Sequence, residues 1–165
     1  MMALTVEGGT GLSDADSLAS LAELETFLSD NAISTTATDA QKEAWLREAT
    51  RYHEATYDYP APVLNSTQAL RLPLNQVITT ADGRTWDGVP AKLKEAIFLL
   101  AAEARNGPLV VNLAAKRKVK SKTDVIESEF VYDDADRRRV FLAADDLVRQ
   151  LGGWKASGIS RVSRS

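Results

Sequence analysis

SLAELETF at residues 20–27 and TDAQKEAWLREATRY at residues 38–52 are the stretches that decide the fold of this chain. Each begins with a hydroxyl residue and carries Glu or Gln three positions later. In such a capping box each of the two side chains accepts a hydrogen bond from the other residue's backbone N–H, which starts a helix. The two stretches therefore predict helices that begin at Leu21 and at Asp39.

Apolar residues recur at three- and four-residue steps in both stretches, which is typical of a helix with one buried face. These residues, with one Thr, are Leu21, Leu24, Phe27 and Leu28 in the first helix and Trp45, Ala49, Tyr52 and Thr56 in the second. The first helix should end at Asp30-Asn31. The second should stop before Tyr59, because Pro60 disfavours a helical conformation at the residue before it.

Two more helices are predicted, over residues 90–106 and 134–151. Pro90 suits a first helical position, and the glycines at 107 and 152 suit helix stops. The segment 81–84, ADGR, predicts a tight turn. Residues 118–132 alternate polar and apolar side chains, which predicts two short strands joined by a turn.

Length and composition fit one globular domain. The chain has 165 residues, of which 44% are hydrophobic and 26% charged, so it can bury a core and does not have the composition of a disordered chain. We expect a mainly α fold, a small four-helix bundle with one β-hairpin, over residues 1–151. Residues 152–165 should form an extended, flexible C-terminal tail.

The residue types exclude several kinds of site. There is no cysteine and one histidine, so thiolate and multi-histidine metal sites are excluded. That histidine, His53, is expected to be a surface or half-buried structural residue, because no nucleophile motif accompanies it. Gly8-Gly-Thr-Gly11 lacks the Lys-Ser/Thr of a phosphate-binding loop and predicts a flexible or turning arm. We expect no metal, no cofactor and no enzymatic activity. No apolar run reaches the roughly 20 residues of a membrane helix, so no membrane partner is expected.

Charge is unevenly distributed along the chain. Residues 1–60 carry 11 acidic and 3 basic side chains, whereas residues 116–165 carry 8 acidic and 12 basic ones. A chain with two oppositely charged ends could pair with its own copies in a head-to-tail ring. Chance variation along a solvated surface explains the charges equally well.

The densest basic segment is Lys116, Arg117, Lys118, Lys120 and Lys122. In a strand, alternate side chains project from one face, so the four lysines would form a row that could neutralise phosphates. No aromatic residue interrupts this segment to supply a stacking surface for bases. There are two competing interpretations of this basic segment. The lysines could protect an edge strand from aggregation, or they could contact an acidic protein surface.

The motifs at 6–12, 20–27, 38–52 and 68–73, in that order, resemble those of the small head–tail adaptor (head-completion, connector) proteins of tailed bacteriophages. Proteins of this kind are often labelled DnaT-like single-stranded-DNA-binding proteins. The resemblance implies a structural virion protein: a ring beneath the portal that provides the attachment surface for the tail while DNA passes through.

The resemblance also implies partners and a location. The partners would be the portal protein, neighbouring copies in a ring that matches the portal's twelvefold symmetry, and a tail-side connector or tail protein, with contact between the basic hairpin and DNA in the channel. The location would be the virion neck, and the host cytoplasm during assembly. The C-terminal tail would dock on the portal through Trp154, Lys155, Ile159, Arg161, Val162 and Arg164. The alternative function is that of a replication accessory protein that binds single-stranded DNA.

Overall fold

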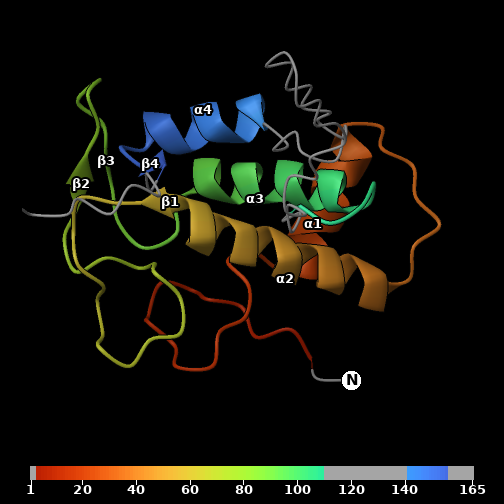
Figure 1. Cartoon of the computed structure of the whole chain (residues 1–165), viewed down its shortest axis with the longest axis horizontal. Coiled ribbons are helices and arrows are strands. Elements are labelled where there is room, and N and C mark those ends of the chain that lie inside the picture. The colour runs from red at the N-terminus through yellow and green to blue at the C-terminus, as the bar shows by residue number, and fades with distance from the viewer. Residues whose placement is uncertain (1–2, 110–140, 156–165) are drawn as a thin grey trace, which may run out of the picture. The chain divides into compact units, whose positions relative to one another are not determined.

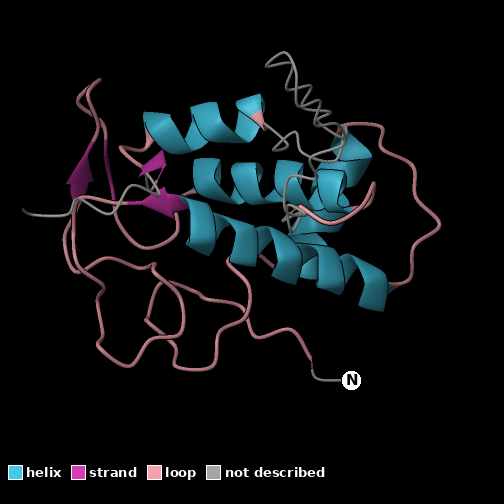
Figure 2. Cartoon of the chain, in the orientation of Figure 1, coloured by secondary structure: helices cyan, strands magenta, loops and turns pink. Residues whose placement is uncertain are grey.

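The computed structural model describes residues 3–109 and 141–155, all of which belong to one compact unit (Figure 1). The described elements are the helices α1 (Leu21–Asp30), α2 (Asp39–Thr56), α3 (Ala91–Ala104) and α4 (Leu142–Gln150), and the strands β1 (Tyr57–Asp58), β2 (Ile78–Thr79), β3 (Thr85–Trp86) and β4 (Trp154–Lys155). Helices therefore dominate this part of the chain, as Figure 2 shows. The predicted mainly α class is confirmed.

Both predicted capping boxes are present. The Ser20 hydroxyl accepts from the Glu23 backbone N–H, and the Glu23 carboxylate accepts from the Ser20 N–H at 2.8 Å. Thr38 and Gln41 make the same reciprocal pair at the start of α2. Both boxes join residues only three positions apart, so the sequence predicted the two helix starts correctly.

The third and fourth helices differ from their predictions at the N-terminal end. Pro90 is the N-cap of α3 rather than its first helical residue. Phe141 precedes α4 with a non-helical backbone, φ −104° and ψ 70°, so the prediction of a continuous helix through this position is wrong. The rest of the predicted helix before Phe141 lies outside the described residues.

The core lies where α3 packs against α2 and α4, with α3 between them in Figure 1. The face of α3 that the sequence predicted is buried, including Leu93, Ile97 and Leu100, each fully inaccessible to solvent. His53 on α2 is also fully buried, which corrects the expectation of a surface or half-buried residue. Its Nε2 lies 2.8 Å from the Tyr59 hydroxyl, so a hydrogen bond compensates the burial of the imidazole.

Two small antiparallel sheets accompany the helices in the described part of the chain. Strands β2 and β3 form a hairpin around the tight turn predicted at 81–84. Strand β4 pairs with β1, which places Tyr57 opposite Lys155 and Asp58 opposite Trp154. Two residues of the tail predicted from Gly152, Trp154 and Lys155, therefore form a paired strand. The lysine-rich hairpin predicted at 118–132 lies outside the described residues, and the division into residues 1–151 and 152–165 stays a prediction.

The glycine-rich N-terminal segment is a turn built around the buried carboxylate of Glu7. Glu7 Oε1 accepts from the backbone N–H groups of Gly9, Thr10 and Gly11 at 2.8, 2.8 and 3.0 Å, and Oε2 accepts from Leu12 N–H at 2.7 Å. Gly9 and Gly11 have φ of 101° and 75°, which favour glycine. Of the two predicted alternatives, the structure supports a turning arm.

Candidate functional site

A cleft of about 660 Å³ opens where the α1–α2 connection passes the C-terminal end of α3. Its volume falls within the roughly 300–1,000 Å³ of small-molecule sites. The lining combines hydroxyl groups, one amide, one aromatic ring and one guanidinium: Ser34, Thr35, Thr36, Ala37, Gln41, Trp45 and Arg105. Arg105 is the one charged side chain among these lining residues, so the cleft suits an uncharged or anionic ligand better than a cation.

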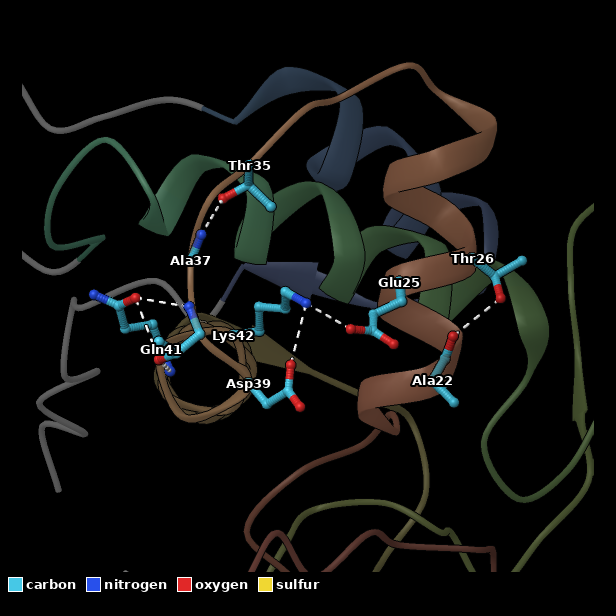
Figure 3. Close-up of polar contacts among 9 residues, drawn as sticks. Ala22, Glu25, Thr26, Thr35, Ala37, Asp39, Gln41 and Lys42 are labelled. Carbon is cyan, nitrogen blue, oxygen red and sulfur yellow. Dashed lines mark hydrogen bonds and ion pairs between the residues drawn. The ribbon is translucent and has the colours of Figure 1, made fainter.

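Local hydrogen bonds hold the wall formed by the α1–α2 connection. Ile33 N–H donates to the Leu28 carbonyl at 2.8 Å as the chain leaves α1. The Thr35 hydroxyl oxygen accepts from Ala37 N–H at 3.1 Å (Figure 3). From α3, Arg105 Nη1 donates to the Ser34 carbonyl at 3.3 Å. These bonds tie the wall to itself and to the opposite side of the cleft.

Lys42 fixes the base of the same connection. Its ammonium lies 2.5 Å from Glu25 Oε1 on α1 and 3.3 Å from Asp39 Oδ1 at the start of α2 (Figure 3). The hydrogen bond to Glu25 contributes most to holding the pKa of Lys42 above its ordinary value, and the bond to Asp39 adds to it. The ammonium is therefore charged at neutral pH and joins the two helices that flank the cleft wall.

Trp45 and Arg105 give the cleft its chemical character. Trp45 is partly buried: it packs against the edge of the core and also lines the cleft. Arg105 is exposed, and a guanidinium has five N–H donors in a fork that matches phosphate or carboxylate. The lining thus combines an aromatic ring, which can stack on a planar group, with an exposed guanidinium, which can bind an anion.

A second hollow, of about 490 Å³, lies between α2 and the 69–70 segment. Its lining includes Asp16 and Glu54 together with Arg51. Asp16 is engaged by Arg47 at 2.6 Å, and Glu54 accepts from Arg71 N–H at 2.7 Å. Two carboxylates in the lining make this hollow unsuitable for an anionic ligand.

The predicted tail contacts fall partly within the described residues. Trp154 is 50% exposed on β4. Lys155 Nζ lies 2.6 Å from Asp145 Oδ2 on α4, and Asp145 also accepts from the Tyr57 hydroxyl. The remaining predicted tail residues, Ile159, Arg161, Val162 and Arg164, lie outside the described residues, as does the basic segment from Lys116 to Lys122.

Within 3–109 and 141–155 no three His, Asp or Glu side chains gather in a way that could hold a metal ion. In the same ranges no helix has the length and apolar character needed to cross a membrane.

A family model described as "Putative DnaT-like ssDNA binding protein" matches residues 2–165. The chain belongs to this family. No curated protein and no solved structure matches it. The family match covers nearly the whole sequence, so it includes the cleft, the basic segment at 116–122 and the C-terminal tail.

Membership of this family corrects the identification as a phage head–tail adaptor. The match supports the alternative, binding of single-stranded DNA, and overturns the portal protein, the ring of copies and the tail connector as partners. Two of the four motifs that carried the resemblance, at 20–27 and 38–52, are helix caps and apolar stripes. Because such features stabilise helices in many proteins, they do not distinguish a virion component from a DNA-binding protein. The expected location in the virion neck or host cytoplasm stays untested.

The sequence did not reveal the cleft. Trp45 was assigned to the buried stripe of α2, and Arg105 follows α3 in a segment that predicted only a helix stop. Arg105 contacts Ser34 across 71 residues of sequence. The Ser and Thr residues of the α1–α2 connection are the one sequence signal that could have indicated a cleft here. They equally predict an ordinary loop.

Proposed function

We propose that the protein binds single-stranded DNA with little sequence preference. The observation that carries this proposal is the family match over residues 2–165. Binding of this kind needs cations that track the phosphate backbone and aromatic rings on which bases stack. We take the small helical domain to be the scaffold that carries both.

The cations would come from the C-terminal third of the chain. Residues 116–165 have a net charge of +4, although the whole chain has −3. Within them, Lys116, Arg117, Lys118, Lys120 and Lys122 are the densest basic segment, and Arg161 and Arg164 follow in a tail without acids. The overall acidity of the chain comes from residues 1–60 and not from the C-terminal third.

Aromatic surface is available on the described part of the molecule. Trp154 is half exposed, and Trp45 lines the same cleft as Arg105. The basic segment itself lacks aromatic residues, so a strand held by that segment would need a ring from elsewhere in the protein. We assign no reaction to the chain, and the expectation that it is not an enzyme stays a prediction.

The test is the salt dependence of binding to a fluorescent oligothymidylate of about 15 nucleotides, measured by anisotropy between about 50 and 200 mM salt. We expect affinity to fall steeply with salt and to be weaker for a duplex of the same length. A plot of the logarithm of the affinity against the logarithm of the salt concentration falls by about 0.7 in slope for each phosphate contact to a single strand. K118Q/K120Q should therefore make this slope less steep by up to about 1.4.

A matched control removes the same charge elsewhere. Arg84 and Arg149 are exposed and paired with Asp82 and Asp146, so R84Q/R149Q changes the net charge equally without touching the basic segment. This control should leave the slope unchanged. Absence of oligothymidylate binding by the wild-type protein at about 50 mM salt would refute the proposed function.

A further inference from the structure

We propose that the cleft beside the α1–α2 connection holds one nucleotide unit of the bound strand, with its base stacked on Trp45 and its phosphate held by Arg105. This inference rests on the proposed function and names a part of the binding site.

The ring of Trp45 is available on the cleft side. It is only partly buried, and it belongs both to the edge of the core and to the cleft lining. Packing on the core restricts the side chain, so little further rotamer freedom would be lost when a base stacks on the ring. Stacking tolerates every base because each has a π-face, which fits binding with little sequence preference.

Arg105 is placed to contact the phosphate of the same nucleotide. Its Nη1 donates to the Ser34 carbonyl at 3.3 Å, which holds the guanidinium against the cleft wall. One hydrogen bond leaves further N–H donors on the planar group, enough for a bidentate contact with a phosphate. No acidic residue is among the described residues that line the cleft, so no carboxylate of this described lining competes for the guanidinium.

The remaining lining groups suit the sugar and the base edges. The Thr35 oxygen already accepts from Ala37 N–H, so its O–H is left to donate to an acceptor. Gln41 Oε1 is used by the α2 cap, so the amide nitrogen of Gln41 is the group that could contact a ligand. A few polar groups around one ring and one cation are typical of a site for a small, partly planar anion.

The cleft wall is also held in place before any ligand binds. Lys42 joins α1 to the start of α2 through Glu25 and Asp39, and the bond from Arg105 ties the connection to α3. A wall restrained in this way costs less entropy to order on binding. The described contacts therefore favour a preformed subsite.

The experiment combines ¹⁹F NMR with binding measurements on the full chain. The protein has three tryptophans, Trp45, Trp86 and Trp154, and 5-fluorotryptophan labelling gives one signal for each. The W45F variant assigns the Trp45 signal. Addition of saturating oligothymidylate should shift the Trp45 signal and leave that of Trp86 unchanged, because the Trp86 ring packs edge-on against Tyr59 and donates to the Leu151 carbonyl.

Substitutions then measure the contribution to affinity. W45L leaves a smaller apolar side chain and removes the stacking surface, and should weaken oligothymidylate binding about five- to 150-fold. W45F should weaken it less. R105Q should lower the salt slope by about 0.7, whereas R51Q, which removes an exposed arginine from the acidic second hollow, should not change it.

The outcomes separate this inference from the proposed function. If the wild-type protein binds oligothymidylate, while W45L and R105Q bind as tightly as wild type and the Trp45 signal does not shift, the subsite is refuted and the function stands. If the wild-type protein does not bind, both are refuted. If circular dichroism shows that W45L does not fold, the shift of the Trp45 signal in the wild-type protein and the salt slope of R105Q still decide whether the subsite exists.

Discussion

The carboxylate of Glu7 should stabilise the native state strongly, and E7Q is the substitution that tests it. Glu7 is 1% exposed, and its two oxygens accept from four consecutive backbone N–H groups of residues 9–12 at 2.7–3.0 Å. Asn65 Nδ2 donates to the Thr10 carbonyl of the same turn at 2.9 Å, so the turn also holds the 65–70 segment. Loss of the carboxylate would therefore loosen two segments.

The magnitude follows from the donors that glutamine cannot satisfy. In E7Q one oxygen can still accept from Gly9, Thr10 and Gly11, but the amide NH₂ would face Leu12 N–H, a donor against a donor. A buried donor without an acceptor costs about 1–3 kcal/mol, and hydrogen bonds to a neutral oxygen are each weaker by about 1 kcal/mol than those to a charged one. The lower desolvation cost of the amide offsets part of this. We expect a loss of about 2–4 kcal/mol in the free energy of unfolding.

The pH dependence gives an independent check. Burial opposes ionisation, but the four backbone N–H donors outweigh it and hold the pKa of Glu7 below its ordinary value. A lowered folded-state pKa means that the stabilisation is fully present above the unfolded pKa of about 4.3 and is lost as pH falls through the folded value. The difference between wild type and E7Q should be largest above about pH 5 and should shrink at lower pH.

Urea unfolding monitored by circular dichroism measures the free energy of unfolding of wild type and E7Q, and shows how their difference varies with pH. In thermal unfolding at neutral pH the melting temperature of E7Q should fall by about 4–16 °C, since about 1 kcal/mol corresponds to roughly 2–4 °C in a domain of this size. Glu95, exposed on α3, provides the matched control, and E95Q should change stability by less than about 0.5 kcal/mol. Equal stability of E7Q and E95Q, or a difference that does not vary with pH, would refute the reasoning.

Two further substitutions test packing in the core and at β4. Y59F removes the hydroxyl that lies 2.8 Å from the buried His53 Nε2, and should lower the free energy of urea unfolding by about 1–3 kcal/mol; an unchanged midpoint would show that the imidazole does not need this partner. G153A places a Cβ 2.6 Å from Val148 Cγ1 and 2.9 Å from the Tyr59 ring, so it should cost about 1–3 kcal/mol in the same assay. G8A, where a Cβ meets nothing within 4 Å, is its control and should be near neutral.

Local features of the sequence predicted the helices well. The boxes at Ser20 and Thr38 involve residues three positions apart, and Gly107 adopts the left-handed conformation, φ 131°, expected after α3. Failures came where a local preference competed with tertiary contacts. The apolar stripe before α4 predicted a longer helix, but Phe141 leaves the helical conformation and its ring packs edge-on against Tyr52 on α2.

The sequence by itself determined the helical class, the starts of α1 and α2, and the turn between β2 and β3, because each depends on side chains within a few residues of one another. Tertiary structure alone decided the complete burial of His53 in the core, the pairing of β4 with β1, and the cleft where Arg105 meets the α1–α2 connection. Such contacts join segments separated by up to about 100 residues, so they arise only when the helices pack. A pattern with a period of a few residues carries no information on which distant segments meet.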